Sequence, residues 1–545
     1  MIRELLKIVG IMLLPVLVTG CSSTLHKQTA AETPTRMSVI ETTTERASEP
    51  ADEQIRPEAF AYYVQAVLYE QMGNPYQAAT YYSRALRYCP GSYEIRFSLA
   101  GHLHKLQEYQ RGLSVLAPII PEDTAVWQLR AITYSATGAE DSARICYLKL
   151  VALDSTQSRA YAYLAGTYRR LNNLDSLIWA YENLTRLRPH QYRLSGELGM
   201  LQAQAGRYEE ARQSYQKSID INSGQNNIAA FIGLGNLYEA NQQPESALTV
   251  FNAAVDVAPS NVVAHRCLRG LYTSLDSLDK ALYHAWREVE LTPLDEGASR
   301  RLGMLYYWLD SLQQSDSIFS QLAENGRPHP ANHFYLGRIA VRRDNFDRAL
   351  QQFTLLTQLS DSLYESWLDL GYVYRELGQH DKEIETYQTG LSHMRDDTGR
   401  SRLLLALGAA HERYGRIDEA LATFEELVAG HPDYDEALNY LGYMLADRGE
   451  RLNYARELIA RAVSHEPDNA AYLDSYGWVH YRLGDYTEAL IHLEKAVTLD
   501  SDPVIFDHLG DVYQAVGESH KARTWWQKAL DLDPDNEQIK QKLGP

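Results

Sequence analysis

The sequence predicts an all-α fold, a right-handed superhelical solenoid of about fourteen helix-turn-helix repeats. Similar residues recur with a period of about 34 positions from Ala59 to Pro534. Within each period, large apolar residues follow the i, i+3, i+4, i+7 spacing of a helix with one buried face. Small residues occupy the same two places in each period, where two paired helices must approach closely. These three observations together indicate stacked helical hairpins.

The repeat unit has a recognisable signature. The clearest copy carries Trp367, Leu370, Gly371 and Tyr374 in the spacing W-x2-L-G-x2-Y. Two other copies supply all eight positions of a longer signature: Phe231, Leu234, Gly235, Tyr238, Ala247, Phe251, Ala254 and Pro259, and Phe506, Leu509, Gly510, Tyr513, Ala522, Trp526, Ala529 and Pro534. This signature resembles the tetratricopeptide repeat (TPR). The resemblance implies a solenoid whose inner surface binds other proteins.

The register of the signature places the array at residues 57–534. The expected starts of the fourteen units lie near residues 59, 93, 124, 158, 192, 228, 262, 296, 330, 364, 401, 435, 470 and 503. The second unit is expected to be the weakest, because Gly112 and Leu116 replace the usual alanine and aromatic residue. Residues 535–545 are expected to form a polar capping helix, which an open-ended stack needs for solubility.

The N-terminus has the pattern of an export signal. A basic start with Arg3 and Lys7 precedes the short apolar run from Ile8 to Val18. The following Val-Thr-Gly-Cys resembles the lipobox of bacterial lipoproteins. That resemblance implies cleavage of residues 1–20 and acylation of Cys21. In a bacterium with two membranes, the serine after Cys21 further implies an outer-membrane anchor facing the periplasm. The alternative is an ordinary signal peptide. Residues 21–56 are rich in Ser, Thr and Glu and are expected to be a flexible tether.

Composition and motifs argue against several functional classes. The net charge of −19 repels phosphate backbones, so no nucleic-acid partner is expected. Gly233-x-Gly235 begins like a dinucleotide loop but falls on repeat packing positions, and His329 and His333 flank a proline that breaks helical metal-site spacing. No cofactor, metal or catalytic activity is expected. Cys89, Cys146 and Cys267 are interpreted as small helical residues, with a disulfide left open.

The candidate binding residues lie at the inner positions of the first helix of each repeat. In the middle of the array these positions are rich in arginine, whose planar guanidinium grips carboxylates, and in aromatic side chains that serve as anchors. The predicted partner-binding residues are Arg159, Arg169, Arg193, Arg266, Arg300, Tyr307, Phe334, Arg338, Arg342, Tyr372, Arg375 and Arg402. The alternative is that these arginines pair with acids of neighbouring repeats. The last units instead place Asp474, Asp507 and Asp511 on this face beside Tyr443, Trp478 and Tyr481, which indicates a different contact.

Residues 437–497 resemble a recurrent subgroup of bacterial TPR proteins, through Ala-Leu-Asn-Tyr-Leu-Gly-Tyr-Met-Leu-Ala-Asp-Arg-Gly and Ala-Tyr-Leu-Asp-Ser-Tyr-Gly-Trp-Val. This subgroup includes outer-membrane lipoproteins that act as adaptors for periplasmic C-terminal processing proteases. The resemblance implies a scaffold that recruits an envelope enzyme, such as a protease or a peptidoglycan hydrolase. Two alternatives stay open, a structural subunit of a secretion, polysaccharide-export or surface-assembly complex, and an enzyme.

Overall fold

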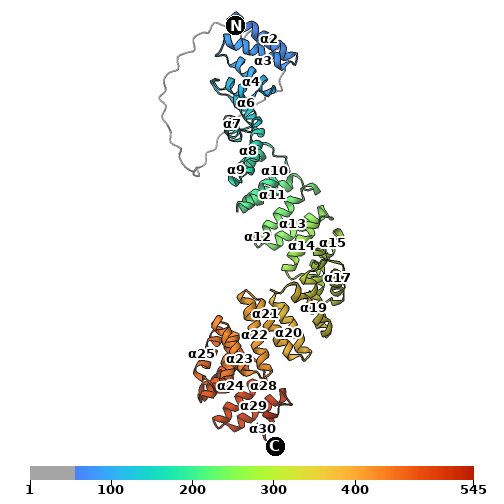
Figure 1. Ribbon diagram of the computed structural model, residues 1–545, viewed down its shortest axis with the longest axis vertical. Coiled ribbons are helices and arrows are strands. Elements are labelled where there is room, and N and C mark those ends of the chain that lie inside the picture. The colour runs from blue at the N-terminus through green and yellow to red at the C-terminus, as the bar shows by residue number, and fades with distance from the viewer. Residues whose placement is uncertain (1–55, 545) are drawn as a thin grey trace. The chain divides into compact units, whose positions relative to one another are not determined.

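The computed structural model describes residues 56–544, which form 29 α-helices, one 3₁₀ turn and no strand (Figure 1). Helices α2 to α29 follow one another as fourteen pairs, and α30 stands alone at the end. Even-numbered helices are the first (A) helices of the repeats, and odd-numbered helices are the second (B) helices. The predicted all-α solenoid of about fourteen helix-turn-helix repeats is confirmed. Residues 1–55, which include Cys21 and most of the expected tether, lie outside the described residues.

The chain divides into two compact units, Met1–Ile120 and Pro121–Pro545. The described helices of the first unit are α2 (Pro57–Gln71), α3 (Pro75–Tyr88), α4 (Tyr93–Lys105) and α5 (Tyr109–Leu116). Helix α5 has 8 residues, whereas α3 has 14. The B helix of the second repeat is therefore short, and this is the repeat that the sequence marks as the weakest.

The second unit contains the other twelve repeats and the terminal helix. Its elements are α6 (Thr124–Ala136), α7 (Glu140–Leu153), α8 (Ser158–Arg170), α9 (Leu174–Leu187), α10 (Tyr192–Gln204), α11 (Tyr208–Ile221), η1 (Gln225–Asn227), α12 (Ile228–Ala240), α13 (Pro244–Val257), α14 (Val262–Ser274), α15 (Leu278–Leu291), α16 (Glu296–Trp308), α17 (Leu312–Asn325), α18 (Pro330–Arg342), α19 (Phe346–Leu359), α20 (Tyr364–Glu376), α21 (His380–His393), α22 (Asp397–Arg413), α23 (Ile417–Gly430), α24 (Asp435–Arg448), α25 (Leu452–His465), α26 (Ala470–Leu483), α27 (Tyr486–Leu499), α28 (Pro503–Ala515), α29 (Ser519–Leu532) and α30 (Glu537–Leu543). Helix α22 begins four residues before the expected start of its repeat, because the Asp396 side chain caps the helix by accepting from the Gly399 N–H at 2.6 Å.

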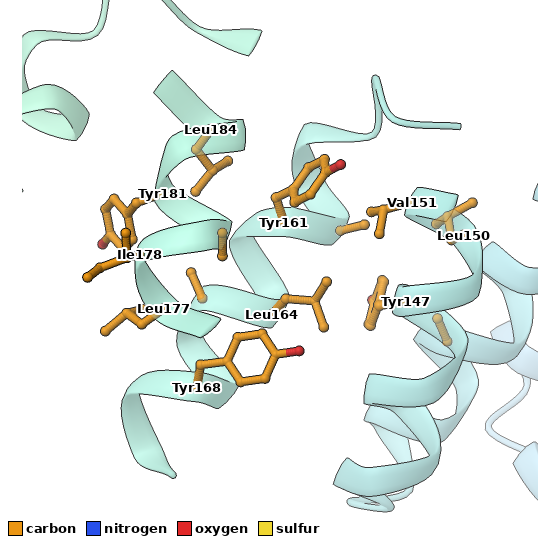
Figure 2. Close-up of a cluster of buried hydrophobic side chains, with 14 of the residues drawn as sticks. Tyr147, Leu150, Val151, Tyr161, Leu164, Tyr168, Leu177, Ile178, Tyr181 and Leu184 are labelled. Atoms are coloured by element: carbon orange, nitrogen blue, oxygen red, sulfur yellow. The ribbon is translucent and has the colours of Figure 1, made fainter. Parts of the chain in front are cut away.

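Within the second unit, clusters of the hydrophobic core extend from one repeat into the next. Figure 2 shows one stretch of it, where side chains of α7, α8 and α9 interdigitate. Tyr161 of α8 and Ile178 of α9 are almost completely buried, and Leu150 of α7 joins them from the preceding repeat. Helix α8 therefore packs against two B helices, α7 and α9, so these repeats bury their apolar surface jointly.

Glycine at the eighth position of the repeat lets the two helices of a pair meet. A Cβ on Gly235 would lie 2.2 Å from the Phe251 ring, and a Cβ on Gly371 would lie 2.2 Å from the Tyr387 ring. Gly233 is equally constrained, since its Cβ would lie 2.5 Å from the ring of Tyr215. The Gly233-x-Gly235 pair is thus a packing feature of α12, as the sequence indicates.

The turn between the two helices of a repeat requires a residue in the left-handed region. Glycine fills this place in several repeats, such as Gly378 with φ of 66°. Elsewhere a non-glycine residue is held there, including Asp276 at 53° and Asp344 at 54°. A side chain in this conformation costs roughly 1 kcal/mol. These turns therefore store a small, local destabilisation.

Replacing Asp276 and Asp344 together by glycine is expected to raise the free energy of unfolding by about 1 kcal/mol in total, because relief of the strain exceeds the added unfolded-state entropy. Urea denaturation followed by circular dichroism measures the change. The reciprocal control, Gly378→Asp, should lower stability by a similar amount. A gain in that control would show that these turns are not strained.

The fifth repeat has a packing gap. Ser195 stands at the position that Tyr161 and Phe231 fill in neighbouring repeats, and the cavity beside it has a volume of about 220 Å³. Leu198 and several polar side chains line the rest of the cavity, and Ser214 donates to the Gln202 side chain at 2.7 Å. A pocket that opens to solvent therefore lies between α9, α10 and α11, where an aromatic side chain packs in the neighbouring repeats.

We expect Ser195→Tyr to stabilise the protein by about 1–2 kcal/mol, because the ring fills the gap and buries apolar surface. Thermal and urea denaturation measure the gain. Tyr161→Ser, which opens the same gap one repeat earlier, should cost roughly 3 kcal/mol. A loss of stability in Ser195→Tyr would mean that the polar lining excludes an aromatic ring.

Candidate protein-binding face

Six of the predicted binding residues form a row across three successive A helices, α16, α18 and α20. We call this set the arginine–aromatic row, and its members are Tyr307, Phe334, Arg338, Arg342, Tyr372 and Arg375. The three guanidinium carbons lie over the three rings, Arg342 over Tyr307 at 4.6 Å, Arg338 over Phe334 at 4.8 Å, and Arg375 over Tyr372 at 4.8 Å. The sequence located these residues, and the structure brings each arginine onto a ring.

Helical spacing produces two of the three stacks. Phe334 and Arg338 are four residues apart on α18, and Tyr372 and Arg375 are three apart on α20, so each pair shares one helix face. The third stack joins successive repeats, since Arg342 ends α18 and Tyr307 belongs to α16. A guanidinium held over a ring gains cation–π attraction and loses rotamer freedom. The row is therefore partly ordered before any partner arrives.

The arginines of the row also contact carboxylates. Arg338 forms a two-pronged ion pair with Asp369 of α20, from Nε at 3.1 Å and Nη2 at 2.9 Å. Burial raises the pKa of Asp369, and the Arg338 charge opposes that rise. Arg342 contacts Asp310 at 2.9 Å, and Arg375 contacts Glu376 at 3.2 Å. The positive charge on this face is thus partly compensated within the protein.

The arginine side chains remain accessible despite these contacts. Exposed fractions are 42% for Arg338, 46% for Arg342 and 37% for Arg375, and the carboxylate of Asp310 is 81% exposed. The Arg342–Asp310 pair is exposed on both sides and contributes about 0–1 kcal/mol, so an incoming carboxylate can replace Asp310 at little cost. Asp369 is only 19% exposed and stays paired with Arg338, whose remaining surface is still open to a partner. The row therefore offers guanidinium donors and aromatic faces to an acidic or aromatic peptide.

The other predicted arginines fall into two groups. Four contact carboxylates: Arg169 with Glu197, Arg266 with Glu288 and Asp295, Arg300 with Glu296, and Arg402 with Glu436. Arg159 and Arg193 are exposed and form no ion pair with the described residues, although Arg193 donates to the Tyr192 hydroxyl at 3.3 Å. The structure therefore does not place all of the predicted arginines in one continuous site.

Ion pairs between neighbouring repeats recur along the array at sequence separations of 30 to 35 residues. Examples are Arg207–Asp175, Arg342–Asp310, Arg338–Asp369, Arg413–Glu383, Arg448–Asp418 and Lys542–Asp507. The separation is close to one repeat length, so each pair joins adjacent units. Several of the predicted arginines therefore link neighbouring repeats and are also accessible to solvent.

One arginine cluster was missed by sequence reasoning. Glu288 of α15 is fully buried and contacts three guanidinium groups, those of Arg269 at 2.6 Å, Arg301 at 3.0 Å and Arg266 at 3.5 Å. These arginines come from α14 and α16, so the carboxylate joins the seventh and eighth repeats. A buried charge needs such pairing, because desolvation alone is costly. The signal was present as three arginines in successive A helices around one acid of the intervening B helix.

The acids of the last repeats are also paired in ways that the sequence did not reveal. His508 Nδ1 lies 2.9 Å from Asp474, and the Lys542 ammonium donates to Asp507 at 2.8 Å and to Asp511 at 2.8 Å. Trp478 stacks on His508 with ring centroids 4.1 Å apart. The predicted aromatic and acidic residues therefore do gather in one place, with two basic residues added.

The remaining predicted sites need only brief mention. Cys146 and Cys267 carry free thiols. The His329 ring accepts from the Ala331 N–H at 3.2 Å and so caps α18, while the His333 ring contacts Gln352. Within residues 56–544, no group of three potential ligands is placed to hold a metal ion, and no helix is long and apolar enough to cross a bilayer.

Comparison with known families identifies the repeat. Models described as tetratricopeptide repeat match residues 63–124, 191–260, 364–392, 401–444, 470–503 and 505–536. These segments fall in both compact units of the chain. The signature that the sequence suggested is thus matched independently along the array.

Several known proteins share these repeats over part of their length. TPR repeat-containing protein PA4667 of Pseudomonas aeruginosa is 35% identical over 133 residues, which are 24% of this chain and 22% of that protein. Human Superkiller complex protein 3 is 28% identical over 165 residues, covering 29% and 10%. The wheat Hsp70-Hsp90 organizing protein is 24% identical over 240 residues, covering 37% and 41%. The chain therefore spans less than half the length of these relatives.

Two solved structures align with the chain at low sequence identity. The Cut9–Hcn1 hetero-tetramer of APC/C gives a TM-score of 0.37 at 14% identity, covering 90% of this chain and 96% of that one. A tetratricopeptide repeat protein from Parabacteroides merdae gives 0.37 at 17% identity, covering 46% and 97%. With its repeat signature, its fourteen helix pairs and these family matches, the chain is a tetratricopeptide repeat protein.

Proposed function

We propose that this protein is a membrane-anchored scaffold or adaptor of the cell envelope, which recruits or activates a periplasmic partner such as a protease or a peptidoglycan hydrolase. TPR arrays serve as protein-interaction scaffolds, and that general role is the starting point. The lipobox-like sequence at Cys21 supports the anchor. The similarity to adaptor lipoproteins at residues 437–497 supports the adaptor role.

The arginine–aromatic row is the observation that carries the proposal. Its three stacked pairs combine exposed guanidinium donors with aromatic surface, the combination that dominates binding energy at protein interfaces. The rings also limit the movement of the arginines, which lowers the entropy lost on binding. The row therefore suits a partner segment that presents carboxylates beside apolar side chains.

Crosslinking in cells tests the proposal. A photo-crosslinking residue at Tyr372 should capture a soluble envelope enzyme, and capture should fall at least tenfold in the double variant Arg338→Ala, Arg342→Ala. Arg343→Ala is the matched control, because Arg343 lies beside Arg342 but pairs with Asp316 outside the row. Capture of pore or export-complex subunits instead would favour a structural subunit. Unchanged capture in the double variant would show that the row does not bind the partner.

The anchor has a separate test. Cys21→Ser should move the protein from the membrane fraction to the soluble fraction of the envelope, because the acyl chains would be lost. A radiolabelled fatty acid should mark the unaltered chain and not the variant. Membrane retention of the serine variant would exclude acylation as the means of anchoring.

A further inference from the structure

Acidic and aromatic side chains of the last repeats lie around a basic side chain of the same chain. We call this set the terminal pocket, and define it by Tyr481 of α26, Asp507 and Asp511 of α28, and Trp526 of α29. The Lys542 ammonium of α30 lies in it, at 2.8 and 2.9 Å from the two oxygens of Asp507 and 2.8 Å from Asp511. The Trp526 ring lies 5.9 Å from the ammonium and its indole N–H donates to Asp511 at 3.1 Å.

The terminal pocket repeats the contact pattern of the arginine–aromatic row with the charges reversed. Asp511 is the ninth residue of α28, as Arg338 is the ninth residue of α18. Lys542 is the sixth residue of α30 and meets Asp511, whereas Asp369, the sixth residue of α20, meets Arg338. The same inward position that presents a cation in the middle of the array thus presents an anion at its end.

Acidic groups outnumber the local cations here. Asp474 is matched by His508, and both side chains are 8% exposed, so neither is available to a ligand. The two carboxylates of the pocket then share only Lys542. Burial raises the pKa of Asp507, while Lys542 lowers it. A cation in this position is therefore needed to stabilise both carboxylates in their charged form.

The present occupant is held by a small element. Helix α30 has seven residues, of which only Ile539 and Leu543 are buried. An isolated helix of this length is marginal in water, and the Lys542 side chain remains 29% exposed on a flexible stem. The ammonium can therefore leave the carboxylates while the two apolar residues keep α30 in place.

A neighbouring group also lacks a partner. The Trp478 side chain stacks between His508 and Tyr481, at 4.1 and 4.9 Å between ring centroids, and is 8% exposed. Its indole N–H has no acceptor among the described residues. A buried donor without an acceptor is costly, and a backbone carbonyl of a bound polypeptide that displaces the side chains around it would satisfy it. This favours a peptide over a free amine as the ligand.

We propose that the terminal pocket binds a lysine or arginine side chain of a partner polypeptide, and that Lys542 is an internal occupant which this side chain displaces. The proposal extends the protein-binding function and assigns to the C-terminal repeats a partner segment of opposite charge from that bound by the arginine–aromatic row. Asp507 and Asp511 receive the cation, and Tyr481 and Trp526 contact its apolar stem.

Binding of a fluorescein-labelled ten-residue peptide of alternating lysine and glycine tests the proposal, with fluorescence anisotropy as the readout on the full exported chain. Lys542→Met removes the occupant and keeps its stem, so the peptide should bind about tenfold tighter. Lys540→Met is the matched control, because Lys540 lies on the same helix but pairs with Glu537 outside the pocket, and its affinity should stay within about twofold of the unaltered chain. Lys542→Arg should also bind like the unaltered chain.

The acidic side is tested in the same assay. Asp507→Asn combined with Asp511→Asn should weaken binding at least tenfold, while Asp531→Asn with Asp535→Asn, which removes two exposed charges nearby, should leave it within about twofold. Circular dichroism confirms that each variant is folded. Equal affinity of Lys542→Met and Lys540→Met would overturn the proposal, as would displacement of the peptide by equimolar spermidine. Crosslinking at the arginine–aromatic row is scored separately, so failure here leaves that result intact.

Discussion

Gly371→Ala is expected to lower the free energy of unfolding by about 2 kcal/mol, and Gly371→Leu by roughly 3 kcal/mol or more. A Cβ at this position would lie 2.2 Å from Tyr387, whose ring is buried in the apolar core of this repeat. Helices α20 and α21 must therefore separate, and the apolar contacts of the tenth repeat are lost. Urea denaturation measures the total loss, and hydrogen–deuterium exchange should place it in these two helices.

Gly270→Ala is the matched control for this prediction. Gly270 also lies within an A helix, but nothing approaches its Cβ position within 4 Å. Alanine there should stabilise α14 by about 0.5–1 kcal/mol, because glycine loses more backbone entropy on folding. The same substitution thus has opposite signs at two helical glycines. If alanine lowers the free energy of unfolding at both positions, these glycines are needed for backbone flexibility rather than for close packing.

Glu288→Ala is expected to cost roughly 3–5 kcal/mol, because it leaves three guanidinium groups facing one another around a buried space. The carboxylate is fully buried and Arg269 and Arg301 lie within 3.0 Å of it. Loss of the charge weakens two repeats at once, so helices α14–α16 should unfold at a lower temperature than the rest of the array. Calorimetry of the variant and of Glu288→Gln measures this.

Glu288→Gln should cost less than the alanine variant, since the amide oxygen still accepts a hydrogen bond and the volume is preserved. Glu290→Ala is the surface control, because Glu290 pairs with Arg287 at the exposed side of the same helix. That change should stay within about 0.5 kcal/mol. If the Glu288 and Glu290 variants lose equal stability, the buried carboxylate contributes no more to stability than an exposed one, and the prediction is wrong.

The repeats were predictable from the sequence because their packing is encoded locally. Gly371 and Tyr387 meet within one unit, so a fixed spacing reveals their contact. The single displaced boundary, at α22, depends on one capping side chain, Asp396, which adds a helical turn. Propensity and periodicity place the helices, whereas caps of this kind move their ends.

The inner-face residues were predictable in position but not in their contacts. The register identified Arg338 and Arg342, yet the acids that pair with them lie 31 and 32 residues away. Whether an arginine meets such an acid depends on the rotamers and on the angle between repeats, which no spacing rule contains. Lys542 was missed for a related reason, because it belongs to a helix beyond the last full repeat but keeps the register of the repeats.

The ion pairs that join neighbouring repeats make the mechanical stiffness of the array depend on salt. Each pair acts across one junction between units, and a stack of units bends by adding small rotations at its junctions. Dissolved ions screen exposed pairs within about 8 Å at physiological ionic strength. The array should therefore be stiffer at low salt concentration and more flexible at high salt concentration, while the apolar core stays unchanged. Optical-tweezer extension at two salt concentrations would measure this elasticity directly.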